Sequence, residues 1–538
     1  MKQFFKYIAF SALLISILGS CHKIDVPIKT ELTPSIFPKD SSQFIQASGP
    51  VYAALRGNYS LDYWFTQTLS TDEAILPAFG GNWYDNQNYK MLHYHNWTKD
   101  HPWTNSCWNW LALIVGTSNQ TLSILNTTEP EGAAKKTNLA EIKMVRALGY
   151  FMFMDLYGNV PIDTTYGDFT PHTNIPRAQV FNFIEREVKA AIPYLSTSTG
   201  ITTYGRANKY TAYALLAKMY LNAEYYTGTK RYDDCIAACD NVINSAAYSI
   251  EPMSTYLKMF YPNNGPQMKE FIFAIPYDPS ASALGGTNGF MYHARYDVPR
   301  SERTKFGLPF TPSAPEMTLP EFYANFNDSK DVRNGQWLTG LQYMSDGVTP
   351  VMVTTTKKGY DQFYAGADGG AAYTYQVNLT PTVTLRQDPT QFDVGNDEIA
   401  WNMGYRNIKF FPDNTSTSRN QNNDVPVFRY SDIILMKAEA ILRGGNPTLG
   451  HTALSLVNMI KANRTTSPAL TTVTLDVLYS ERCREFSWEA WHRNDMIRFG
   501  KYEGKWGFKT DADVNHRIFP IPTGAMVVNP ALKQNPGY

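Results

Sequence analysis

The sequence has no excess of charge of either sign and few charged residues overall. Its 538 residues include 48 Lys and Arg against 48 Asp and Glu, so the formal net charge at pH 7 is zero. Nucleic-acid binding depends on clustered Lys and Arg that displace counterions, and this balance gives no indication of such a surface. Charged residues make up 18% of the chain, below the roughly 25% usual in soluble domains, whereas Phe, Trp and Tyr make up 14%. Uncharged polar and aromatic side chains must therefore cover much of the surface.

Cysteine is also scarce. Besides Cys21, the chain contains Cys107, Cys235, Cys239 and Cys483. Their spacing is too wide for a small disulfide scaffold, and no two form a Cys-x-x-Cys pair. We expect buried thiols that act as small hydrophobic side chains, with a metal or redox pair as the alternative.

No apolar run after the first twenty residues approaches the roughly 20 residues that a membrane-spanning helix needs. The N-terminus has two lysines, an apolar run from Tyr7 to Leu18 and a small-residue ending, which is the pattern of a secretory signal peptide. We therefore predict a signal peptide over residues 1–20, with an uncleaved anchor as the alternative. The ending Leu-Gly-Ser-Cys resembles the lipobox of bacterial lipoproteins, which implies that Cys21 is lipidated. Acyl chains there would tie the protein to a membrane while its body stays in water.

Helical periodicity is strong in several segments. Asn138 and Glu141 form a capping pair ahead of a long apolar stripe that Gly158 ends. Residues 208–243 and 432–464 each have the pattern of two helices joined by a glycine-containing turn.

Hairpins of this length are typical of tetratricopeptide units. The sequence therefore predicts a mainly α fold, in which tetratricopeptide-like helical hairpins form a right-handed scaffold over about 38–250 and 425–500.

Residues 251–424 have a different composition. They are rich in Gly, Pro, Thr, Tyr and Asn, and contain short β-prone runs at 271–275 and 351–353 and a low-complexity stretch at 365–372. Loops on a rigid scaffold are where binding residues usually collect. We predict a loop-rich, ligand-binding half here.

Five of the eleven tryptophans lie between residues 83 and 110. An aromatic ring offers a flat apolar face to a sugar ring, and neighbouring Asn, Asp and Gln can hydrogen-bond its hydroxyls. Trp108 and Trp110 precede a helical pattern and are expected in the core. The turn before them is the better exposed candidate, so the predicted ligand contacts are Asn82, Trp83, Tyr84 and Asp85. Aromatic residues of the central loops have the same chemistry and are further candidates: Tyr292, Tyr296, Trp337, Tyr360 and Tyr373.

Three histidines, His93, His95 and His101, lie close together. On a strand, the first two would share one face, but no further ligand follows at a spacing typical of a metal site. Ordinary hydrogen-bonding histidines are favoured, and we predict neither a metal nor a cofactor.

Glu485 and Glu489 lie four residues apart, so a glycosidase acid and nucleophile on one helical face are conceivable. Arginines surround them at spacings of three and four, which favours ion-paired helix packing: Arg482, Arg484, Arg493 and Arg498. The chain also has no Gly-x-Ser-x-Gly elbow and no P-loop. We assign no catalytic residue and expect a protein that is not an enzyme.

Several short motifs follow one another along the chain. The N-terminal half contains Cys21 with residues 24–27 (Ile-Asp-Val-Pro), Thr71-Asp72-Glu73, the run from Trp108 to Leu122, residues 141–147 (Glu-Ile-Lys-Met-Val-Arg-Ala) and residues 155–162 (Asp-Leu-Tyr-Gly-Asn-Val-Pro-Ile). The C-terminal half contains residues 428–440 (Phe-Arg-Tyr-Ser-Asp-Ile-Ile-Leu-Met-Lys-Ala-Glu-Ala), residues 481–486 (Glu-Arg-Cys-Arg-Glu-Phe), Pro520-Ile521-Pro522, Asn529-Pro530 and residues 534–538. In this order and spacing they resemble the SusD/RagB family of outer-membrane nutrient-binding lipoproteins over nearly the whole chain.

The resemblance implies one SusD-like domain over residues 21–538, anchored in the outer membrane through Cys21 and facing the cell exterior. It further implies a protein that binds an oligosaccharide and delivers it to a SusC-like TonB-dependent transporter. Capture of a peptide, as in RagB-like proteins, is the alternative ligand class. The residues alone also leave open a surface glycoside hydrolase and a protein-interaction scaffold without a glycan ligand.

Overall fold

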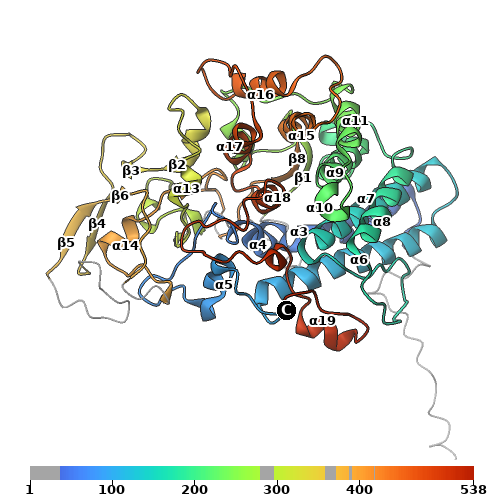
Figure 1. The fold of residues 1–538 in the computed structure, drawn as a ribbon, viewed down its shortest axis with the longest axis horizontal. Helices are drawn as coiled ribbons and strands as arrows, with labels where there is room; N and C mark the ends of the chain where they lie inside the picture. Colours follow the sequence, from blue (N-terminus) through green and yellow to red (C-terminus); the bar gives the residue numbers. More distant parts are fainter. Residues whose placement is uncertain (1–36, 279–295, 358–370, 387–390, 417–418) are drawn as a thin grey trace, which may run out of the picture.

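The structure is a computed structural model that describes residues 37–278, 296–357, 371–386, 391–416 and 419–538. The described part is mainly helical, as predicted (Figure 1). Cys21, Tyr292 and Tyr360 lie outside the described residues. No helix within the described ranges is both long and apolar enough to cross a membrane.

The first half of the chain is a series of helices around one large core. Two of them, α6 and α7, are long and pack closely: a side chain on Gly149 of α7 would come within 2.9 Å of Ile114 of α6. Trp108 and Trp110 of α6 are buried, which confirms their predicted core positions. The helices are α2 (Ser41–Gln46), α3 (Gly49–Asn58), a π-helical turn (Tyr59–Tyr63), α4 (Trp64–Thr68), α5 (Asn88–Tyr94), α6 (Pro102–Thr128), α7 (Ala133–Tyr157) and α8 (Arg177–Ala191).

The predicted start of α7 was wrong. The helix begins at Ala133, and the Asn138 side chain donates a hydrogen bond to Glu129 (2.8 Å) instead of capping the helix. A capping motif is a local signal, and here a contact with the preceding turn takes its place. The end of the helix at Gly158 is as predicted, since that residue has a φ of 70°.

Both predicted helical hairpins are present, and α11 of the first packs on α15 of the second (Figure 1). The first begins at Asn208, whose side chain accepts the N–H groups of Tyr210 and Thr211. Its helices are α9 (Lys209–Leu221), α10 (Ala223–Thr227) and α11 (Tyr232–Ile243). The second consists of α15 (Tyr430–Leu442) and α16 (Ala453–Ala462), followed by α17 (Leu475–Phe486), α18 (His492–Arg498) and α19 (Thr523–Val528).

Two paired strands enclose most of the segment predicted to be loop-rich, the first near its start and the second directly after its end at residue 424. Strand β1 (Phe271–Ile275) pairs antiparallel with β8 (Val425–Arg429), and every residue of both strands is buried. The elements between them are short: α13 (Pro320–Tyr323), α14 (Glu398–Asn402), and the antiparallel pairs β2 (Trp337–Leu338) with β7 (Arg406–Asn407), β3 (Gly340–Leu341) with β6 (Asn378–Leu379) and β4 (Met352–Thr355) with β5 (Tyr373–Gln376). Most of these lie together at the left of Figure 1, opposite α6 to α11. Short 3-10 turns complete the chain: η2 (Asp85–Gln87), η3 (Gly200–Thr202), η4 (Leu257–Phe260), η6 (Arg300–Glu302), η7 (Val332–Gln336) and η9 (Val514–Arg517).

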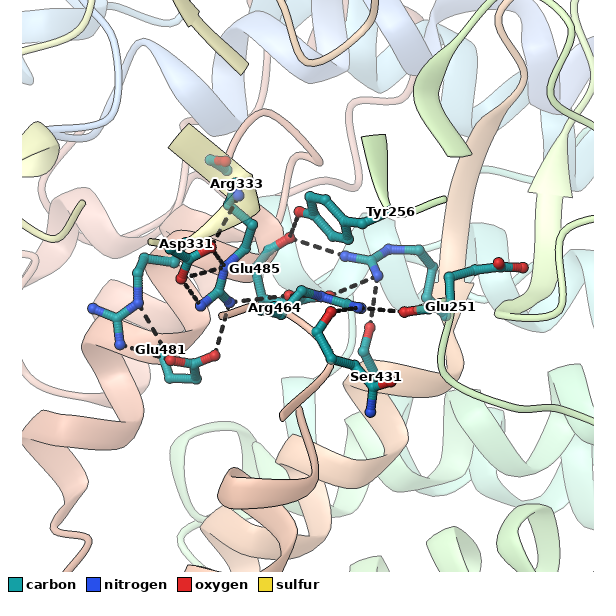
Figure 2. A network of polar contacts seen from close by, with 12 residues as sticks. Glu251, Tyr256, Asp331, Arg333, Ser431, Arg464, Glu481 and Glu485 are labelled. Atoms are coloured by element: carbon teal, nitrogen blue, oxygen red, sulfur yellow. Dashed lines mark hydrogen bonds and ion pairs between the residues drawn. The ribbon is translucent and has the colours of Figure 1, made fainter. Parts of the chain in front are cut away.

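A buried ionic network around Glu485 of α17 joins the loop-rich half to the helices (Figure 2). The Glu485 carboxylate accepts hydrogen bonds from Arg333 of η7 (3.1 Å), Arg429 of β8 (3.0 Å) and Arg464 after α16 (2.9 Å). Burial alone would raise the pKa of Glu485, but the charges of Arg464 and Arg429 hold it well below its usual range. The carboxylate therefore stays charged and ties three separate segments together.

The prediction of ion-paired packing at Glu485 and Glu489 is confirmed, but the predicted arginine partners were wrong. Glu489 pairs with Lys409 and Arg429. The arginines close to it in sequence bind elsewhere: Arg482 to Asp432 and Asp495, Arg484 to Glu481, Arg493 to the Arg517 carbonyl, and Arg498 to Glu439 and Asp495. Residue spacing along one helix could not identify ion-pair partners that lie on other segments of the chain.

Candidate functional site

A two-residue hairpin turn presents the predicted aromatic contacts. Phe79 and Asn82 pair across Gly80 and Gly81, which have φ values of 60° and 86°. Positive φ at both central positions is what a type I′ turn requires, and glycine adopts it without strain. The turn then leads directly into Trp83, which is half-buried.

The residues after this turn are unusual in backbone conformation. Trp83, Asp85, Asn86 and Gln87 all have positive φ, between 40° and 67°. Such conformations are costly for residues with a side chain and are found where surrounding contacts impose them. The tight path leaves Tyr84 45% exposed and Asp85 exposed, as the sequence predicted for a surface turn.

Tyr296 lies beneath this turn. Its ring packs edge-on against Trp83, with centroids 5.8 Å apart, and against Phe65 at 5.0 Å. Because Tyr296 is only 9% exposed, it supports Trp83 from the core side.

Trp337 does not belong to the surface. It is 7% exposed and packs perpendicular to Trp488, with centroids 5.4 Å apart, and against Tyr323 and Phe326. The loop-rich composition around it gave no sign that strand β2 runs through the core. We therefore do not retain Trp337 in the candidate site.

A cavity of about 400 Å³ opens beside Asn82. Its walls come from the turn at Asn82, η6, strands β4 and β5, and α14. Its lining includes Asn82, Arg300, Val353, Thr354, Thr355, Lys357, Tyr375, Asn396, Asp397, Glu398, Trp401 and Asn402. The cavity is within the size range of small-molecule sites and combines aromatic rings with amide, hydroxyl and charged groups.

Trp401 of α14 is the main aromatic surface of this cavity. Its ring stacks on Phe79, with centroids 4.2 Å apart and an angle of 21° between the planes. Its indole N–H donates a hydrogen bond to Asn396 Oδ1 at 2.8 Å, which fixes the rotation of the ring. One face of the ring is covered by Phe79, and the half-buried residue lines the cavity.

Strand β5 contributes a second aromatic wall. Tyr373 and Tyr375 project to the same side of the strand, and their rings stack at 5.9 Å and 16°. Burial raises the pKa of Tyr375 to about 12, with a further contribution from the charges of Glu398 and Asp397. The phenol is therefore neutral near pH 7 and can both donate and accept a hydrogen bond.

The carboxylates that suggested catalysis cannot meet a substrate. Glu485 is fully buried and Glu489 is 2% exposed, and both are saturated by cations. In the cavity itself, Asp397 caps α14, where Oδ1 accepts the N–H groups of Ile399 and Ala400. The arrangement is suited to holding a polar ligand.

The three clustered histidines are structural. His93 lies in helix α5 instead of the strand considered for it, and all three are buried. The rings of His95 and His101 are hydrogen-bonded to the carbonyl groups of Ser70 (2.9 Å) and Asn88 (3.1 Å). Burial lowers the pKa of His95 and of His101 to about 4, so both are neutral. Within the described ranges, no cluster of three or more His, Cys, Asp or Glu residues could hold a metal ion.

Sequence reasoning missed Trp401 and the residues around it. The segment from Asn396 to Asn402 has the same mixture of amides, acids and an aromatic residue that drew attention to residues 82–85. That composition could have identified it, whereas its position opposite Phe79 could not be inferred. Of the predicted contacts, the structure brings Asn82 into the cavity wall and places Trp83, Tyr84 and Asp85 directly after it.

Comparison with known proteins agrees with this fold. The SusD family model matches residues 214–538, and a second family model, described as starch-binding and associating with the outer membrane, matches residues 39–221. The chain belongs to the SusD family.

Relatives of this SusD-family chain match it over most of its length. The starch-binding protein SusD of Bacteroides thetaiotaomicron is 24% identical over 497 residues, which cover 87% of this chain and 84% of that protein. A SusD-like protein of Bacteroides ovatus is 24% identical over 504 residues, covering 85% and 82%.

Solved structures share the fold at lower identity. A laminarin-binding SusD-like protein superposes with a TM-score of 0.70 at 21% identity, covering 93% of this chain and all of that one. Surface glycan-binding protein A of Bacteroides thetaiotaomicron, solved in complex with laminarihexaose, gives a TM-score of 0.67 at 17% identity, covering 92% and 99%.

Proposed function

We propose that this SusD-family protein binds an oligosaccharide in the cavity beside Asn82 and does not hydrolyse it. The observation that carries the proposal is Trp401, a tryptophan that lines a polar cavity and whose ring is held by Phe79 on one face and by Asn396 at its indole N–H, so that it can act as a fixed apolar stacking surface. Sugar rings have an apolar C–H face and a rim of hydroxyl groups, so they match such a surface.

The polar lining complements the aromatic surface. Asn82, Asn396 and Asn402 supply amides, and Tyr375 supplies a neutral hydroxyl beside Glu398. These groups can hydrogen-bond sugar hydroxyls around a ring stacked on Trp401. The starch-binding and laminarin-binding relatives support a glycan as the ligand class.

We further propose that Cys21 carries a lipid that anchors the protein at the outer membrane, facing the cell exterior, and that the bound glycan passes to a SusC-like TonB-dependent transporter. The lipobox-like sequence at residues 18–21 and the outer-membrane association in the description of the matching family support this part.

The test is glycan binding by the purified chain from residue 22 to residue 538. We expect binding in a glycan-array screen, followed by affinity measurement by calorimetry. The Trp401→Ala variant should bind about 2- to 10-fold more weakly, since an aromatic stacking contact contributes about 0.5–1.5 kcal/mol. Tyr166→Ala is the matched control, because Tyr166 is an exposed aromatic residue outside the cavity wall.

Three results would contradict the proposal. Unchanged affinity in Trp401→Ala, with Tyr166→Ala also unchanged, would move the ligand away from this cavity. Release of new reducing ends from the bound glycan would make the protein a glycoside hydrolase. Binding of peptides in place of any glycan would replace the proposed ligand class with the peptide alternative.

A further inference from the structure

Asp393 holds the Gly80–Gly81 turn without lining the cavity. Its Oδ1 accepts the N–H groups of Gly80 (2.8 Å) and Gly395 (2.7 Å), and its Oδ2 accepts the N–H of Gly81 (2.7 Å). Asp393 is buried, and all three donors are backbone groups of glycine. Hydrogen bonds to a carboxylate are stronger than those between neutral groups, so this residue is a firm attachment point.

The two bonds from Gly80 and Gly81 connect segments that are more than 300 residues apart in sequence, since Gly80 and Asp393 are separated by 313 positions. The connection is continued by the backbone, since the Ala78 N–H donates to the Phe392 carbonyl and the Val394 N–H donates to the Ala78 carbonyl, both at 2.9 Å. On one side the chain continues to Asn82 and Trp83, and on the other to Asn396 and Trp401.

The residues that follow the turn need such an attachment. Positive φ at Trp83, Asp85, Asn86 and Gln87 is intrinsically unfavourable, so the sequence of this segment does not favour its conformation by itself. A contact from outside this segment must supply the missing preference, and Asp393 supplies two hydrogen bonds directly before it, at Gly80 and Gly81.

We propose that Asp393 is a positioning residue that fixes the Gly80–Gly81 turn, and with it Asn82, relative to Trp401, so that both sides of the cavity meet one ligand. This inference rests on the proposed function for its ligand, but its structural part can be tested without one. Asp393 itself does not line the cavity.

Asparagine is the informative replacement. Asp393→Asn keeps the size of the side chain but replaces one acceptor oxygen with an NH₂ group. Whichever way the amide is turned, an NH₂ group then faces a glycine N–H, so at least one bond becomes a contact between two donors. Asp413→Asn is the matched control, because Asp413 is also buried in the loop-rich half and accepts the N–H groups of Thr415 (2.8 Å) and Asn422 (3.2 Å) away from the cavity lining.

The first experiment is hydrogen exchange on the ligand-free chain from residue 22 to residue 538. In Asp393→Asn we expect at least tenfold faster exchange in peptides that cover residues 78–87, with peptides of α6, α7 and α15 unchanged. Asp413→Asn should leave residues 78–87 as in the wild type. Unchanged exchange at 78–87 in Asp393→Asn would overturn the proposal. So would a melting temperature lowered far more than in Asp413→Asn with exchange raised everywhere, because Asp393 would then hold the whole fold.

The second experiment is a double-mutant cycle on binding of a glycan that the wild type recognises. If Asp393 acts by placing Asn82, which lines the cavity, then Asp393→Asn should weaken binding at least fivefold, and the double variant with Asn82→Ala should bind within about twofold of the weaker single variant. Additive losses would overturn the proposal. Absence of glycan binding by the wild type would refute the proposed function alone, and the hydrogen-exchange result would still decide the role of Asp393.

Discussion

Asp424 shows how the setting of a single carboxyl group makes stability depend on pH. It is buried beside β8, and its side-chain oxygens accept hydrogen bonds from neutral donors, the Tyr204 hydroxyl at 2.5 Å and the Tyr277 N–H at 2.9 Å. Burial raises the pKa of Asp424 from 3.8 to about 6, and these hydrogen bonds only partly oppose that rise. Glu485 is the opposite case, since its arginine partners keep it charged.

The raised pKa of Asp424 predicts the sign of this pH dependence. The folded chain binds the Asp424 proton more tightly than the unfolded chain, so the contribution of Asp424 to stability falls as the pH rises from about 4 to about 6. Asn cannot ionise, so its contribution does not change with pH. Between about pH 4 and about pH 6, the free energy of unfolding of Asp424→Asn should therefore rise by about 2–3 kcal/mol relative to that of the wild type. Urea unfolding of both proteins at pH 4, 5, 6 and 7 measures this difference. A difference that does not change with pH would refute the prediction.

Single residues also show how much of the candidate site could be predicted from the sequence. The Gly80–Gly81 turn and the rings after it were predictable, because turn glycines and their neighbours form a local pattern. Trp401 was missed, and Trp337, which was predicted as a contact, is buried, because exposure is decided by distant partners such as Phe79 and Trp488. No local pattern contains that information.

At the scale of elements, the helical hairpins were predictable and their ionic partners were not. Apolar periodicity and the glycine turns placed α9 to α11 and α15 to α16, because each helix must bury one face. The partners of α17 come from η7, β8 and the end of α16, so spacing within the helix predicted pairing but not the pairs.

The buried ionic network at α17 predicts that a single substitution within it strongly lowers the stability of the protein. Glu485→Gln removes one charge while Arg333, Arg429 and Arg464 remain buried around it. Breaking a buried ion pair by changing one partner costs about 3–5 kcal/mol, so we expect a loss of stability of that size in urea unfolding. Asp476→Asn is the control, since Asp476 forms an exposed pair with Lys501, and such pairs contribute about 0–1 kcal/mol. A loss below 1 kcal/mol in Glu485→Gln would show that the network contributes little.

At the scale of the whole molecule, the loop-rich half and the helices depend on each other. Arg333 and Lys409 from the loop-rich half neutralise Glu485 and Glu489 near the end of α17. Phe79 from the N-terminal half in turn covers one face of Trp401. Neither half would keep its buried charges and rings satisfied without the other.

This dependence predicts a single unfolding transition. Circular dichroism at 222 nm reports mainly the helices, and the fluorescence of Trp337 and Trp401 contributes a signal from the loop-rich half. In a urea titration both signals should change with the same midpoint and slope. Two separated midpoints would mean that the loop-rich half unfolds independently.

The antiparallel pairing of β1 with β8 places Ile275 directly opposite Val425. The chain thus leaves the helical framework and returns to it at one point, and loop-closure entropy grows only slowly with the length of such an excursion. Insertions or deletions between these strands, away from the buried Arg333 and Lys409, would leave both attachment points where they are. Diversification of the recognised molecule in the course of evolution is therefore compatible with an unchanged helical framework.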